Sequence, residues 1–134
     1  MHSLNDVTKV PLQQINQELA VLETGTNNNF TSFQRLFYLT QQQNAHRGRH
    51  AHKAQKQLLI CLQGSCDVIC DDGTNSTTHT LLPNHIGLYI PPGIWGEQIY
   101  LENNTILLVA CDAHYDEDDY IRDYQEFLAY RDRT

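Results

Sequence analysis

Short strand-like runs, separated by turn signals, recur along this chain at regular spacing. They cover residues 19–22, 35–39, 57–62, 68–70, 79–82, 87–90, 98–101 and 105–110. The clearest turn signals are the Asn-rich residues 24–29 and the sequence Asp71-Asp72-Gly73, whose glycine can adopt a positive φ. Many short strands bury their apolar side chains in a sandwich or a barrel. We therefore predict an all-β fold.

One segment near the C-terminus has a different pattern. Residues 116–128 begin with a run of acidic residues and continue with apolar side chains on one stripe, namely Tyr120, Ile121, Tyr124, Phe127 and Leu128. Acidic residues favour the start of a helix, and an apolar stripe lets it pack. We predict a short C-terminal helix over 116–128. At 134 residues, the chain fits one compact domain, 1–134.

Composition excludes several functional classes. The net charge is -7 and no basic block offsets it, which argues against non-specific nucleic-acid binding. No apolar stretch approaches the ~20 residues needed to span a bilayer, and the N-terminus does not resemble a signal peptide. We expect a soluble cytoplasmic protein that does not bind membranes. The four cysteines form no CxxC motif and are expected to be reduced thiols in the core.

The most informative polar residues are His50 and His52. Successive side chains of a strand alternate between its faces, so both imidazoles project to one side and share a pocket. They lie in the frame Gly48-x-His50-x-His52-x4-Gln57-x6-Gly64, which resembles the first motif of the cupins. Gln57 occupies the position where that motif has a metal-binding glutamate.

The second cupin motif ends in Pro-x-Gly-x-x-His, and here Pro91-Pro92-Gly93-Ile94-Trp95-Gly96 has glycine in the histidine position. Two of the usual four ligands are therefore replaced, and an amide is a poor metal ligand. We predict a site without metal or other cofactor. His46, His85 or Glu97 would complete a metal site only by an unusual geometry.

Two unmetallated histidines suit proton transfer, because neutral imidazole titrates near neutrality. A base that removes a proton beside a ketone, together with donors that stabilise the enediolate, isomerises a keto sugar. Tyr38, on the preceding strand, could orient a histidine or donate to a sugar oxygen. Arg47 and Arg49 could bind a phosphate, since guanidinium groups bind phosphates in a bidentate manner.

Four blocks together resemble the WxcM/FdtA-like sugar-nucleotide 3,4-ketoisomerases. They are Arg47-Gly48-x-His50-Ala51-His52-Lys53, the segment 59–68, Gly87-Leu88-Tyr89-Ile90-Pro91-Pro92-x-Ile94-Trp95 and the segment 115–124. The resemblance implies a metal-free cupin jelly roll. It also implies conversion of a dTDP-4-keto-6-deoxyhexose into its 3-keto isomer, as a step toward a 3-amino-deoxysugar of lipopolysaccharide or O-antigen.

The resemblance also implies roles for individual residues. His50 becomes the C3 base and His52 its partner in reprotonation at C4, although the order could be reversed, and Tyr38 contacts the hexose or a histidine. Arg35 and Arg47 are candidates for the diphosphate. The remaining candidates for substrate contact are Gln57, Trp95 and Glu97. The resemblance further implies a homodimer that exchanges an N-terminal strand, for which residues 19–22 are the candidate.

Two positions depart from the family pattern. Asn16 and Gln17 stand where the family commonly has Arg-Gly, and Gly96 stands where it usually has His or Arg. These differences leave the stereochemistry at C4 open. The alternatives are a sugar-nucleotide-binding cupin without catalytic activity and a metal-dependent cupin enzyme with altered ligands.

Overall fold

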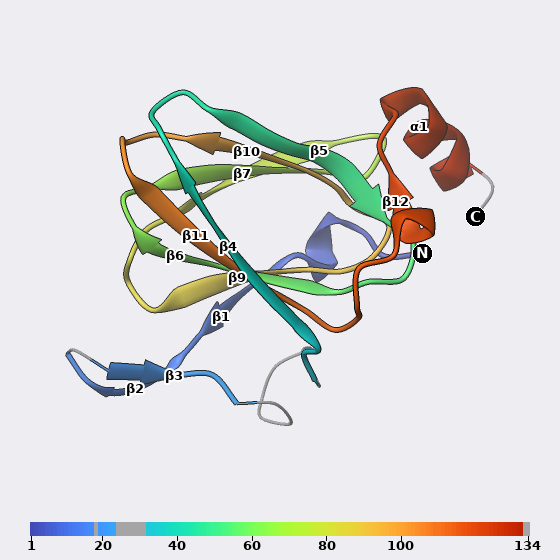
Figure 1. Cartoon of the computed structure of the whole chain (residues 1–134). Helices are drawn as coiled ribbons and strands as arrows, with labels where there is room; N and C mark the ends of the chain where they lie inside the picture. Colours follow the sequence, from blue (N-terminus) through green and yellow to red (C-terminus); the bar gives the residue numbers. More distant parts are fainter. Residues whose placement is uncertain (18, 24–31, 133–134) are drawn as a thin grey trace.

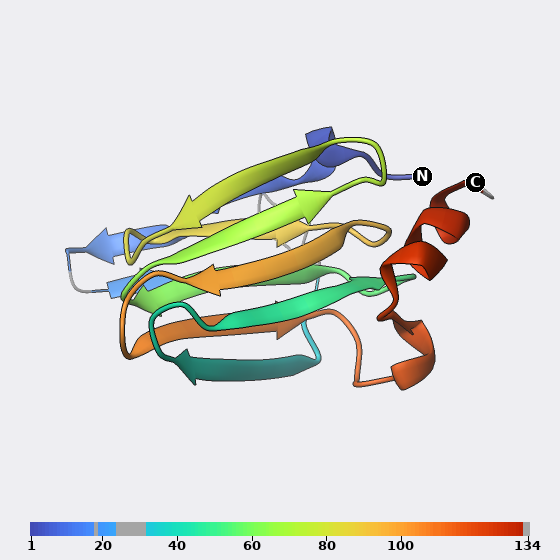
Figure 2. The ribbon, with the colours of Figure 1, turned by 90° about the horizontal axis from the view of Figure 1, so that it is seen from above.

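The computed structural model describes residues 1–17, 19–23 and 32–132, and most of the chain forms two antiparallel sheets that face each other (Figures 1 and 2). The first five-stranded sheet has the order β1-β9-β6-β11-β4: Thr8–Pro11, Ile86–Ile90, Gln57–Gln63, Thr105–Cys111 and Arg35–Gln41. The second has the order β12-β5-β10-β7-β8: Tyr120–Ile121, His46–His52, Trp95–Tyr100, Cys66–Asp71 and Ser76–Leu81. The predicted all-β jelly roll is confirmed. In the part of the chain that the structure describes, no hydrogen-bonded strand pair joins the two sheets into a closed barrel.

The main core lies between the two sheets because alternate side chains of their strands point inward. In β7, Cys66, Val68 and Cys70 are fully buried while the residues between them are less so. They pack with apolar side chains of the facing sheet, including Leu59, Leu107 and Val109. Period-two burial of this kind is the expected pattern for a strand with one face on a core. All four cysteines are buried and free, as predicted.

The sequence did not reveal the first two strands, β1 and β2, whereas the strand predicted over 19–22 is present as β3. β1 extends the first sheet by pairing with β9. Within the described residues, β2 (Gln13–Asn16) pairs only with β3 (Leu19–Val21). This β2–β3 hairpin projects away from the two sheets (Figure 1). The four residues of β2 are all exposed, so they have no apolar alternation to predict a strand. The predicted loop 24–29 lies outside the described residues.

The predicted helix over 116–128 is wrong in its extent. A 3₁₀ turn (η2, Glu117–Asp119) and the short strand β12 come first, and the α-helix α1 begins at Tyr124 and ends at Asp132. Tyr120 pairs with His52 and Ile121 with Ala51, so this segment joins the sheet. Pairing with the edge of β5 outweighs the local helical preference.

Helix α1 packs on the outer face of the second sheet, at one end of the molecule (Figure 2). Its Phe127 is buried against Ala51, Trp95 and Ile121. Across residues 1–17, 19–23 and 32–132, no helix is long and apolar enough to cross a membrane.

Candidate active site

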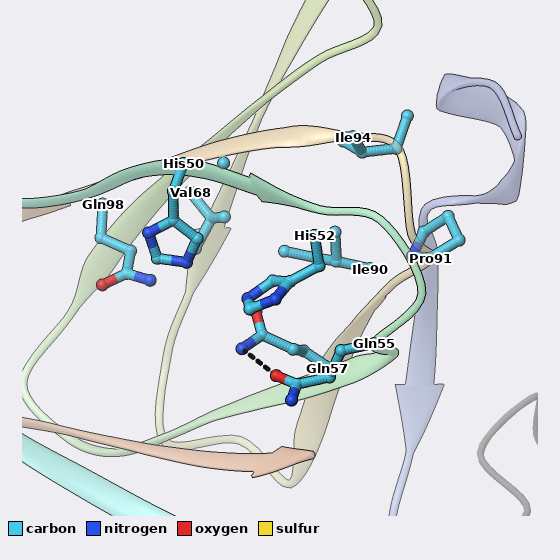
Figure 3. A pocket seen from close by; sticks show the side chains of 10 residues that line it. His50, His52, Gln55, Gln57, Val68, Ile90, Pro91, Ile94 and Gln98 are labelled. Atoms are coloured by element: carbon cyan, nitrogen blue, oxygen red, sulfur yellow. Dashed lines mark hydrogen bonds between the residues drawn. The ribbon is translucent and has the colours of Figure 1, made fainter. Parts of the chain in front are cut away.

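His50 and His52 lie side by side on β5, as the alternation of the strand predicts. Their ring centroids are 5.0 Å apart and the rings are nearly perpendicular. Both line a small cavity of about 20 Å³ between the sheets (Figure 3). Ala51, between them, points to the opposite face and is buried beneath α1. The two imidazoles therefore share one interior site.

The small cavity has both apolar and amide walls. The side chains around the two histidines in Figure 3 include the apolar Val68, Ile90, Pro91 and Ile94 and the amides Gln55, Gln57 and Gln98. Gln57 donates to Gln55 Oε1 over 3.3 Å. His50, Gln57 and Gln98 also line a second cavity of about 550 Å³, so the two spaces adjoin at His50.

A β-bulge turns a cation toward the larger cavity. His50 pairs with Gly96 and Gly48 pairs with Glu97, which leaves Arg49 as the extra residue of β5. Gly48 and Arg49 both have positive φ, 84° and 62°. The bulge reverses the alternation, so Arg47 pairs with the inward-facing Gln98. Without it, Arg47 would point away from the histidines.

The larger cavity is rich in cations. The cations that line it are Arg35, Arg47, Arg49 and Arg122, and its other lining residues include His46, Tyr115 and Tyr120. The guanidinium of Arg35 lies 4.7 Å from the ring centroid of Phe37 and 5.3 Å from that of Tyr115. These cation–π contacts hold Arg35 toward the cavity. The volume and charge suit an anionic ligand of nucleotide size.

Both histidines are held in the neutral form at neutral pH. Burial, followed by the proximity of His52, lowers the pKa of His50 to about 4. Burial also lowers the pKa of His52, although a hydrogen bond to Asp119 opposes this effect. A neutral imidazole can accept a proton, so both rings are in the form that a base requires.

The structure adds two residues that the sequence did not single out. Asp119 Oδ2 lies 3.0 Å from His52 Nδ1. The Tyr120 ring centroid lies 4.3 Å from that of His52 and 5.0 Å from that of His50, and the Arg122 guanidinium lies 4.2 Å from the same Tyr120 centroid. The sequence analysis placed Asp119 and Tyr120 in the predicted helix. An acidic residue near the start of a helix and an aromatic residue on its apolar stripe are explained by helix stability and packing, so neither pointed to the site.

The chain matches the family described as FdtA, WxcM-like, C-terminal, over residues 2–132. It belongs to the FdtA family. The TDP-4-oxo-6-deoxy-alpha-D-glucose-3,4-oxoisomerase of Aneurinibacillus thermoaerophilus is 39% identical over 113 residues, which cover 84% of this chain and 81% of that protein.

Solved structures of FdtA-like enzymes are also similar. The sugar 3,4-ketoisomerase QdtA of Thermoanaerobacterium thermosaccharolyticum, in complex with TDP, superposes with a TM-score of 0.90 at 30% identity over 98% of both chains. The TDP-quinovose 3,4-ketoisomerase WlaRB of Campylobacter jejuni superposes with a TM-score of 0.84 at 36% identity, over 92% of this chain and 97% of that one.

Three residues predicted from the FdtA resemblance lie away from both cavities. Tyr38 pairs with Leu108 on the outer face of its sheet and is 71% exposed, while Phe37 faces the cavity. Trp95 packs against α1 and donates to Glu97 Oε2, which lies on the same outer face of β10. Strand alternation is the reason, because Gly96 and Gln98 take the inward positions. Tyr38, Trp95 and Glu97, expected to be site residues, thus line neither cavity of this chain.

The remaining predicted residues converge. His50, Arg35, Arg47 and Gln57 line the larger cavity, and His52 and Gln57 line the smaller one. At the two exchanged cupin positions, Gln57 and Gly96 both line the histidine cavity. Among the residues that the structure describes, no three His, Cys, Asp or Glu side chains gather as a metal-binding group.

Proposed function

We propose that this FdtA-family chain is an isomerase that converts a dTDP-4-keto-6-deoxyhexose into the dTDP-3-keto-6-deoxyhexose. The observation that carries the proposal is the pair of adjacent imidazoles in one cavity, beside a larger space lined by arginines. The relatives named above are 3,4-oxoisomerases or ketoisomerases of TDP-sugars. A histidine-to-asparagine variant of QdtA has been crystallised with TDP-4-keto-6-deoxyglucose, which agrees with this substrate class.

The reaction moves one hydrogen between adjacent carbons and one between adjacent oxygens. The C3–H bond breaks as an imidazole nitrogen takes the proton, and its electron pair enters the enediolate. A proton moves from the C3 oxygen to the C4 oxygen, and C4 then receives a proton as the C3 carbonyl forms. No oxidant is consumed. We assign His50 as the C3 base and His52 as its partner at C4.

The cationic wall fits the diphosphate. Arg35 and Arg47 lie on strands of the two facing sheets and line the same cavity, so a diphosphate between them would contact both. Gln57 lies between that cavity and the histidines, where an amide can bind a sugar hydroxyl. The sugar would then lie over His50 and His52.

We also propose a homodimer that exchanges its N-terminal strand. The outer face of the first sheet exposes Leu36 and Leu62, with exposed fractions of 56% and 52%, beside an apolar groove of about 370 Å³. Ile15 and Leu19 are likewise exposed on the projecting hairpin. Exposed apolar surface of this kind favours association with a second copy. Light scattering coupled to gel filtration measures the oligomeric state.

Three further elements of the proposal are a single domain over 1–134, a cytoplasmic location and a role in making a 3-amino-deoxysugar for surface polysaccharide. An aminotransferase must consume a 3-keto sugar to give that product. The proposal for the reaction itself is tested by NMR of the product from dTDP-4-keto-6-deoxyglucose. The 3-keto isomer is expected, and its C4 configuration is read from the same spectrum. TDP binding with unchanged sugar would instead identify a binding protein without catalytic activity.

A further inference from the structure

We propose that Asp119 is a positioning residue for this reaction: its carboxylate holds His52 as the Nδ1–H tautomer and keeps Nε2 free to carry the proton in transit. The inference rests on the proposed function, because it assigns a part in that chemistry. Asp119 lies on η2, 67 residues further along the chain than His52 and 65 further than Ala54 in the loop after β5.

The tautomer follows from the hydrogen bond. An ionised carboxylate only accepts hydrogen bonds, so at 3.0 Å from Asp119 Oδ2 the His52 Nδ1 must carry the proton. A neutral imidazole then has no proton on Nε2. That atom is buried, has no hydrogen-bond partner within the described residues, and belongs to a side chain that lines the small cavity. His52 therefore presents a proton acceptor to the site.

The carboxylate cannot easily turn away from His52. The backbone N–H of Ala54 donates to Asp119 Oδ1 over 2.7 Å, and that of Gln55 donates to Oδ2 over 3.3 Å. The backbone N–H of Lys53 donates to the Asp119 carbonyl over 2.9 Å. On the other side, the His52 carbonyl accepts from Gly93 N–H over 2.7 Å. Both partners are thus fixed by main-chain bonds, which preorganises the pair.

The two histidines differ in how well they can hold a charge. A proton on His52 Nε2 makes an imidazolium next to an anion that is only 14% exposed. The cations Arg122 and Arg35 oppose protonation of His52 from further away. Glu117 raises the pKa of His50, but its influence is weaker than the lowering by burial and by His52. An imidazolium is therefore better stabilised at His52 than at His50, and His52 is the residue that donates a proton to C4.

The test uses Asp119→Asn, which keeps the shape of the side chain and can still accept from the Ala54 backbone N–H through its single amide oxygen. We expect kcat to fall by about 10²-fold or more, as expected for loss of a tautomer-fixing carboxylate. KM for the dTDP-sugar should change by less than about threefold, because Asp119 lines neither cavity. Asp118→Asn removes the same charge from the neighbouring exposed position and is the matched control, with kcat unchanged.

A spectroscopic readout separates this inference from the proposed function. Nitrogen-15 NMR of the histidine rings, which needs no turnover, should show His52 with a proton on Nδ1 and none on Nε2 in the unmodified protein. Asp119→Asn should weaken that preference. A proton on Nε2 in the unmodified protein, or an unchanged kcat in a folded Asp119→Asn, would overturn the inference. If Asp119→Asn does not fold, the tautomer of the unmodified protein decides. Failure of the unmodified protein to isomerise the sugar would instead count against the proposed function.

Discussion

Acidification should unfold this protein in a way that depends on His50. The pKa of His50 falls from 6.5 in the unfolded chain to about 4 in the folded protein, chiefly through burial. Between these values the unfolded chain binds more protons than the folded one. The contribution of His50 to the free energy of unfolding is therefore most favourable above pH 6.5. It falls as the pH drops from 6.5 to about 4 and does not change further below about pH 4.

The expected magnitude follows from the two pKa values. Integrating the proton uptake of one site between pH 7 and pH 5 gives a loss of about 2 kcal/mol in the free energy of unfolding. His52, whose pKa is also lowered, acts in the same direction. His50→Asn cannot take up the proton, so its loss over the same interval should be smaller than that of the unmodified protein by about 2 kcal/mol.

Urea unfolding followed by circular dichroism at pH 7 and pH 5 measures both losses. The comparison between variants cancels the contribution of the carboxylates, which titrate in both proteins. His114→Asn, which removes an exposed histidine, is the control and should behave like the unmodified protein. Equal losses in His50→Asn and the unmodified protein would refute the claim that the site holds His50 neutral.

Four further substitutions test where the structure places residues in and around the site. Arg47→Gln should raise KM for the dTDP-sugar by about 10-fold or more, with a smaller effect on kcat, because a charge-assisted bond to the diphosphate is lost. Steady-state kinetics measures both constants, and an unchanged KM would contradict the placement of Arg47 at the diphosphate. Tyr38→Phe should leave kcat/KM within about twofold, since the outer face of the sheet carries Tyr38; a large loss would show that the hydroxyl reaches a site, for example across a dimer. Gly96→Ala should be neutral or stabilising by up to about 1 kcal/mol, because no atom lies within 4 Å of the added Cβ. Gly48→Ala should destabilise, because the bulge needs φ of 84° and the Cβ would lie 3.1 Å from the Gly96 carbonyl oxygen; equal melting temperatures for the two variants would contradict this difference.

The sequence predicted the histidine pair because alternation along a strand is a local property. His50 and His52 needed only the period of two to be placed together, and the buried strands around them were found from their apolar residues. The same alternation predicts that Trp95 and Glu97 share one face of their strand and that Gly96 and Gln98 share the opposite face. The resemblance to a family pattern identified the segment but not the face.

The parts that could not be predicted depend on contacts between distant segments. Arg47 faces the cavity only because a bulge at Gly48 and Arg49 reverses the alternation, and no local signal marks that bulge beyond the glycine. Asp119 binds a histidine 67 residues earlier in the chain. Its neighbourhood is acidic and amphipathic, so local pattern favours a helix, whereas β12 gains hydrogen bonds to β5 that only the folded sheet provides.

The central claim is that the two histidines move a proton between C3 and C4 of a dTDP-linked keto sugar. The most direct measurement is NMR of dTDP-4-keto-6-deoxyglucose incubated with the protein in deuterated water. The unmodified protein should give the 3-keto isomer with deuterium at C4, and folded His50→Asn and His52→Asn should give neither product nor label. Product formed by both variants at the unmodified rate, or a sugar that the unmodified protein leaves unchanged and unlabelled, would contradict the claim.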